Sequence, residues 1–150
     1  MENDFSILIA EDDPNDVMLL EMAIRKNGIT NPVNVVRDGE EAVEYLEGKG
    51  QYGDRHKFPF PNVIITDVKM PRRNGMEVVE WVRHHPKCSI IPIVMLSGSR
   101  IENDVVKAYK LGANSYFTKP TTLDELTELI RLAFDYWIRC EQPPKPKNAG

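Results

Sequence analysis

The chain has 150 residues, of which 41% are hydrophobic, and its formal net charge is -4 at pH 7, so one globular domain with a hydrophobic core is expected. The acidic balance argues against nucleic-acid binding, which draws on clustered lysine and arginine. No apolar run approaches the ~20 residues of a membrane span, and the two cysteines lack metal-ligand spacing, so a cytoplasmic protein without membrane contact is expected.

Segments of strand and helix length alternate five times along the chain. Short apolar runs predict the strands, and apolar residues at helical spacing predict the helices between them. In chain order we expect a strand over 5–10, a helix from Pro14 to about Gly28, a strand over 33–36, a helix over 40–46, a strand over 63–66, a helix over 75–83, a strand over 91–96, a helix over 101–111, a strand over 115–118 and a helix after Thr122.

Capping residues mark the ends of three of these helices. Asp13 is typical of an N-cap and Pro14 of a first helical position, and Gly112 is typical of a helix end. Thr122 and Glu125 have the spacing of a capping box. The stripe of the last helix that is predicted to face the core consists of Leu123, Leu126, Ile130, Ala133, Phe134 and Trp137.

The strands contain continuous isoleucine and valine rather than alternating apolar and polar residues. Such runs are typical of a parallel sheet that helices cover on both faces. The alternation of strand and helix therefore predicts one α/β domain with a doubly wound sheet. We assign residues 1–140 to this domain and the polar, Pro-rich residues 141–150 to a tail that is predicted to be disordered.

One connection, residues 49–61, is longer than the turn between a helix and a strand needs to be. It enters the amino end of the strand over 63–66, whereas ligands of such sheets bind at the carboxyl ends. Its Tyr52, His56 and Phe58 make it a candidate contact surface for a partner protein.

Polar side chains follow four of the five strands. Glu11 and Asp12 come after the first strand, Asp67 after the third, Ser97 after the fourth and Lys119 after the fifth. Each alone is more simply a helix cap or a turn residue, but the carboxyl ends of parallel strands share one edge of the sheet. Three converging carboxylates require a hard divalent cation, so the set predicts magnesium. The ammonium and the hydroxyl would complete a pocket for a phosphoryl group.

Four segments, SILIAEDDPND, IITDVKMP, IVMLSGS and SYFTKP, resemble in order and spacing the signature segments of response-regulator receiver domains. The likeness extends over roughly residues 5–141. It implies a flavodoxin-like fold with five helices and five parallel strands in the order 2-1-3-4-5. It also implies a phosphoacceptor of a two-component system that assists its own phosphotransfer and dephosphorylation, and not an enzyme.

The resemblance assigns a phosphoacceptor and a set of metal ligands. By likeness to the family, Asp67 is the carboxylate that becomes phosphorylated. Asp12 and Asp67 would bind magnesium directly, the backbone carbonyl of Lys69 would be a third protein ligand, and Glu11 would act largely through water. Lys69 itself, with Gly98 and Ser99, occupies positions that tune dephosphorylation in the family.

The resemblance also implies a conformational switch. Lys119 is similar to the lysine that pairs with the bound phosphoryl group, and Lys119–Pro120 is expected to be a cis peptide bond. The hydroxyl of Ser97 would follow the phosphoryl oxygen, and Tyr116 would turn inward when Ser97 moves. An aromatic residue in an edge strand is equally consistent with simple packing, so both interpretations of Tyr116 stand at this point.

The connection over 49–61 and the absence of a following output domain resemble the stand-alone receivers that partner phytochrome histidine kinases. A histidine kinase, in particular a phytochrome, is therefore the expected phosphodonor, and an unidentified protein the downstream target. Two alternatives remain: a receiver-like interaction module that is never phosphorylated, and a magnesium-dependent phosphohydrolase. The second is disfavoured because Asp67 is not followed two residues later by another aspartate.

The last helix carries a second apolar stripe, formed by Leu129, Leu132 and Tyr136 and lying roughly 110° around the helix from the first. One interpretation is a helix that is buried on a wide face. The other is an interface with a second copy of the chain or with another partner.

Overall fold

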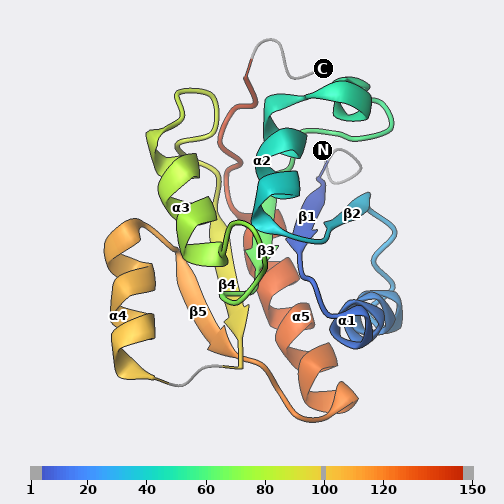
Figure 1. Cartoon of the computed structure of the whole chain (residues 1–150). Coiled ribbons are helices and arrows are strands. Elements are labelled where there is room, and N and C mark those ends of the chain that lie inside the picture. The colour runs from blue at the N-terminus through green and yellow to red at the C-terminus, as the bar shows by residue number, and fades with distance from the viewer. Residues whose placement is uncertain (1–4, 99–100, 147–150) are drawn as a thin grey trace.

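A computed structural model describes residues 5–98 and 101–146, and its centre is a five-stranded sheet (Figure 1). All four strand pairings are parallel and the order is β2-β1-β3-β4-β5, which confirms the predicted doubly wound, flavodoxin-like fold. The strands are β1 (Ile7–Ala10), β2 (Val33–Val36), β3 (Val63–Thr66), β4 (Ile93–Ser97) and β5 (Ser115–Thr118).

The strand β4 differs most from its prediction, because it begins at Ile93 and includes Ser97. Pro92 has no N–H to donate to a ladder, although its carbonyl accepts from Ile64 N–H at 2.9 Å. At the other end, Ser97 is paired with Thr118 of β5. Ser97 therefore belongs to the sheet and does not follow it.

Each of the five helices begins within one residue of its predicted start. They are α1 (Pro14–Lys26), α2 (Gly39–Glu47), α3 (Gly75–His84), α4 (Glu102–Leu111) and α5 (Leu123–Arg139), with a short 3-10 helix, η2 (Gly50–Gly53), after α2. Asp13 caps α1 and accepts from Asn15 N–H at 2.8 Å, as predicted. Of the capping box predicted for α5, the structure contains the bond from Glu125 N–H to the hydroxyl of Thr122, 3.1 Å long.

Helices cover both faces of the sheet, and each face has its own hydrophobic core. The helices α1 and α5 contact one another and cover one face, where Leu20 and Ile130 pack beside Ile9 and Leu96. The helices α2, α3 and α4 cover the other face. In the predicted core stripe of α5, Leu126 and Ile130 are buried, and Leu123, Phe134 and Trp137 are partly buried against the same core.

The connection over 49–61 packs onto the end of α2, away from the carboxyl edge of the sheet. The rings of Tyr52 and Phe58 each lie against Tyr45, with centroids 5.0 and 6.0 Å away. The guanidinium of Arg55 donates to the carbonyls of Tyr45 at 2.9 Å and Leu46 at 3.0 Å, in the last turn of α2, where carbonyl groups lack the N–H partners of the helix interior. Since Tyr52 is buried, its predicted role in a partner contact surface is wrong, and of the three residues only His56 is exposed.

Residues 141–146 follow α5 without forming a helix or strand. The side chain of Gln142 donates to the carbonyl of Trp137 at 2.6 Å, and Pro143 lines a small cavity together with Phe60 and Ile91. This part of the tail therefore lies against the domain, while residues 147–150 are outside the described ranges. Over residues 5–98 and 101–146, no helix combines the length and apolar character needed to cross a membrane.

Candidate functional site

Strand pairing brings the ends of β1 and β3 together. Ala10 lies opposite Thr66 in the parallel register, and Asp67 N–H donates to the carbonyl of Ala10 at 3.0 Å. The following residue of the first strand, Glu11, donates its N–H to the carbonyl of Val36 at 3.0 Å. The acids that follow the two strands are therefore neighbours, as the sequence predicts.

The side chains of Glu11, Asp12 and Asp67 form a group of carboxylates. One oxygen from each lies within 4.8 Å of the others. Glu11 is buried, Asp67 is mostly covered and Asp12 is exposed, so the group is open to water on one side. Carboxylate oxygens and water are the ligands that magnesium prefers, and this donor set fits a hard divalent cation.

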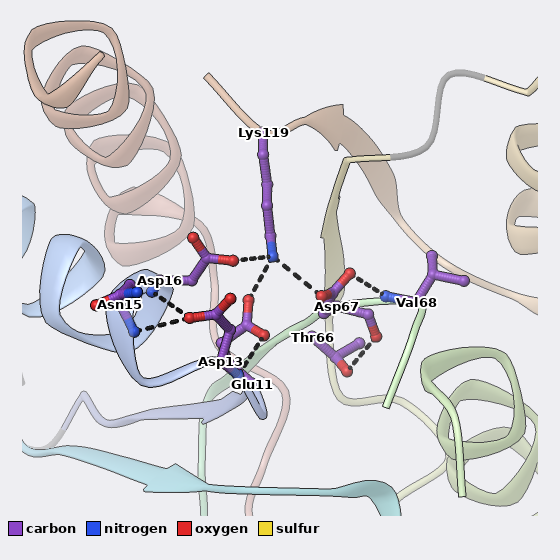
Figure 2. Close-up of polar contacts among 8 residues, drawn as sticks. All are labelled: Glu11, Asp13, Asn15, Asp16, Thr66, Asp67, Val68 and Lys119. Atoms are coloured by element: carbon purple, nitrogen blue, oxygen red, sulfur yellow. Dashed lines mark hydrogen bonds and ion pairs between the residues drawn. The ribbon is translucent and has the colours of Figure 1, made fainter. Parts of the chain in front are cut away.

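The ammonium of Lys119, predicted to pair with a phosphoryl group, lies among the carboxylates of Glu11, Asp16 and Asp67 (Figure 2). Its Nζ is 2.5 Å from Glu11 Oε1, 3.0 Å from Asp67 Oδ2 and 2.7 Å from Asp16 Oδ2. The other oxygen of Asp67 accepts from Val68 N–H at 2.6 Å. These bonds hold the carboxylate of Asp67 in one orientation.

Burial and the close approach of these charged groups shift the pKa values of Glu11 and Lys119. Burial raises the pKa of Glu11 to about 7, and the neighbouring Asp67 adds to this while the bond from Lys119 opposes it. Burial by itself would lower the pKa of Lys119, but its bonds to Asp16, Glu11 and Asp67 outweigh burial and raise that pKa above its usual value. Lys119 therefore carries its positive charge at neutral pH.

Asp16 is the residue of this site that the sequence interpretation missed. It lies in the first turn of α1 and is a partner of Lys119. One feature of the sequence could have indicated it: Asp16 is an acid four residues after Asp12. It lies just inside the helix whose start Asp13 and Pro14 predict. Acids in a first turn are common because they interact favourably with the helix dipole, so the position alone does not indicate a site.

The predicted switch residues lie at the adjoining edge of the sheet. Ser97 is buried, and its carbonyl accepts from Lys119 N–H at 2.7 Å. Tyr116 is partly buried and packs against the core beside α4. Lys69 is exposed, two residues beyond Asp67, and Ser99 is outside the described residues.

The prediction of a cis peptide bond at Lys119–Pro120 is wrong. No peptide bond in the described ranges is cis, and this one lies within them. The trans isomer is the lower in free energy even before proline, by about 0.5–1 kcal/mol.

The second apolar stripe of α5 divides into two parts. Leu129 is partly buried and packs against the core shared with α1. Leu132 and Tyr136 are 56% and 62% exposed. A wide buried face therefore accounts for Leu129 and not for the other two.

The chain is similar to known proteins over most of its length. The family model of the response regulator receiver domain matches residues 7–131. The response regulator Rcp1 of Synechocystis sp. is 31% identical over 138 residues, which are 92% of each chain.

Solved structures are similar over nearly the same span. The phosphorylated cyanobacterial phytochrome response regulator RcpA has a TM-score of 0.85 and 30% identity, covering 93% of this chain and 99% of that one. The Mn(2+)-bound form of Rcp1 has a TM-score of 0.82 and 30% identity, with the same coverage.

Proposed function

The chain belongs to the response regulator receiver domain family, and we therefore propose that it accepts a phosphoryl group from a histidine kinase on Asp67, with magnesium as cofactor. The observation that carries this proposal is the convergence of three carboxylates and one ammonium at the carboxyl edge of the sheet. Proteins of this family are phosphoacceptors and do not, in general, turn over a substrate.

The residues of the site have separate tasks in the proposed transfer. A carboxylate oxygen of Asp67 forms a bond to phosphorus as the bond from phosphorus to the donor nitrogen breaks, and the electron pair of that bond stays with the nitrogen. Lys119 supplies positive charge to the phosphoryl oxygens. Asp12, Asp67 and the carbonyl of Lys69 would hold magnesium, with Glu11 acting largely through water, and the bound ion would supply positive charge to the phosphoryl oxygens.

The proposed output is a change of conformation that a downstream protein recognises. The phosphoryl group adds negative charge beside Lys119 and Ser97, and the hydroxyl of Ser97 moves toward it. Tyr116 of β5 turns inward when Ser97 moves. Ser97 belongs to β4 and Tyr116 to β5, so the signal passes through the edge of the sheet that these two strands form.

The phosphodonor is proposed to be a phytochrome-type histidine kinase. This rests on the similarity to RcpA, a phytochrome response regulator that covers nearly the whole chain. The cytoplasmic location that the sequence predicts remains a prediction.

The two alternatives are weaker. A module that is never phosphorylated has no need to hold Glu11, Asp12 and Asp67 so close together. The single positive charge of Lys119 leaves an excess of negative charge, which costs stability unless a metal cation binds there. A phosphohydrolase of this kind uses as its acid and base a second aspartate two residues after the phosphorylated one, and Lys69 stands at that position here.

Removal of magnesium tests the proposed function. With acetyl phosphate and magnesium, the intact mass of the protein is expected to increase by one phosphoryl group, and chelation of the metal by EDTA should prevent this. A matched incubation with sodium chloride in place of magnesium controls for ionic strength, and it should give no labelling. Labelling that continues unchanged in EDTA would contradict a role for the metal.

A second prediction concerns α5. We propose that the exposed pair Leu132 and Tyr136 lies in an interface between two copies of the chain. Sedimentation velocity at high micromolar concentration should then detect a dimer, and the double change Leu132→Ser with Tyr136→Ser should convert it to a monomer. Met18→Ser, at an exposed apolar residue of α1, is the control. A wild-type monomer, with or without phosphoryl group, would reject the interface.

A further inference from the structure

The loop that follows the phosphoacceptor is joined by an ion pair to a helix that contributes nothing to the carboxylate cluster. Arg72, in the loop between β3 and α3, donates from Nε and Nη2 to Asp38 Oδ2 at 2.9 and 2.5 Å. Asp38 is the N-cap of α2, and its Oδ1 accepts from Glu41 N–H at 2.8 Å. One carboxylate therefore caps α2 and holds the guanidinium of the loop.

The backbone beside this ion pair restricts which residues fit at two positions, Arg72 and Gly39. Arg72 has φ of 65°, the only positive φ of a non-glycine residue in the described ranges, and a side chain there is disfavoured. Beside it, Gly39 N–H donates to the carbonyl of Arg73 at 2.9 Å. A Cβ at Gly39 would lie 2.1 Å from that oxygen, so the close approach of α2 to the loop needs glycine.

The other end of the loop is held just as closely. Gly75 N–H donates to the carbonyl of Val68 at 2.8 Å. A Cβ at Gly75 would lie 1.9 Å from the carbonyl oxygen of Asp67, so α3 begins in contact with the phosphoacceptor backbone. Lys69, Met70 and Pro71 lie in the loop between Val68, which is bonded to Gly75, and Arg72, which is paired with Asp38. Lys69 and Pro71 are exposed, and Met70 is partly buried.

We propose that the Asp38–Arg72 pair is a positioning device, which fixes the loop so that the carbonyl of Lys69 faces the cation. This rests on the proposed function, from which the role of that carbonyl comes. Arg72 is three residues beyond Lys69, and the intervening backbone has few rotatable bonds because Pro71 restricts it. Release of Arg72 from Asp38 would let Arg72 leave its left-handed conformation and turn the carbonyl away.

A role in stability alone fits the pair less well. The carboxylate of Asp38 is 10% exposed but the side chain of Arg72 is 62% exposed, and solvent screening on that side reduces what the ion pair contributes to stability. The pair nevertheless holds a residue in a disfavoured conformation. The second ion pair of the loop, Arg73 Nε to Glu40 Oε2 at 3.2 Å, also reaches α2, but Arg73 has no such conformation.

Calorimetric titration of the full chain with magnesium tests the proposal. Arg72→Ala and Asp38→Asn are each expected to weaken magnesium binding by about tenfold, as loss of an outer-sphere partner typically does. Asparagine caps a helix as well as aspartate does, so Asp38→Asn retains the fold of α2. The double variant should bind magnesium no more weakly than the weaker single variant, because both changes remove the same contact. Arg73→Ala is the matched control and should bind as wild type does.

Amide hydrogen exchange over residues 68–74 gives a readout that needs no metal. Exchange there is expected to accelerate in Arg72→Ala and Asp38→Asn and to stay unchanged in Arg73→Ala. Wild-type affinity for magnesium in Arg72→Ala, or an equal loss in Arg73→Ala, would overturn the positioning role alone. Failure of the wild-type chain to bind magnesium would overturn that role and the proposed metal-dependent function together.

Discussion

Asp67→Asn is expected to abolish phosphorylation of the protein. The amide oxygen of asparagine lacks the negative charge of a carboxylate and does not form a stable acyl phosphate, so no slower route through the same residue remains. In the presence of acetyl phosphate and magnesium, intact-mass spectrometry should detect the phosphoryl group on wild type and none on the variant. We expect complete loss.

The neighbouring Asp13 provides the control. Its side chain caps α1 through the N–H groups of Asn15 and Asp16, and it makes no contact with Lys119 in the described structure (Figure 2). Asp13→Asn keeps the cap and removes one negative charge from the same edge of the sheet. It should be labelled as wild type is. Equal labelling of Asp67→Asn and wild type would reject the assignment of the phosphoacceptor.

Lys119→Ala is expected to accept the phosphoryl group about a hundredfold more slowly, since one charged donor to the phosphoryl oxygens is lost. It should also fail to transmit the signal once phosphorylated, because the charge that couples the phosphoryl group to Ser97 is gone. The rate follows from the time course of intact mass. The signal follows from the change in amide exchange over residues 115–118 on phosphorylation.

The control for this variant is Lys110→Ala, which removes an exposed lysine from α4 and no contact of the site. Its labelling rate and exchange pattern should match those of wild type. If phosphorylated Lys119→Ala reproduced the wild-type change over residues 115–118, the coupling role of Lys119 would be refuted, even with slow labelling.

The sequence by itself was sufficient for the order of elements and for most of the site. Most strands are local runs rich in isoleucine and valine, and caps such as Asp13 and Thr122 mark helix starts, so these features depend on neighbouring residues in the chain. Parallel pairing then places the carboxyl end of every strand at one edge of the sheet. For this reason the sequence alone was enough to group Glu11, Asp12, Asp67, Ser97 and Lys119.

Only the tertiary structure decided which side chains touch across that edge. The contact of Asp16 with Lys119 spans 103 positions of the chain, and that of Arg72 with Asp38 spans 34. Neither has a local pattern, because an acid in a first helical turn and an arginine in a loop are common in any protein. The burial of Tyr52 and the separation of Leu129 from Leu132 and Tyr136 likewise depend on which neighbours the fold supplies. Local patterns specify segments, whereas the direction and partner of a polar side chain are set by distant segments that pack against it.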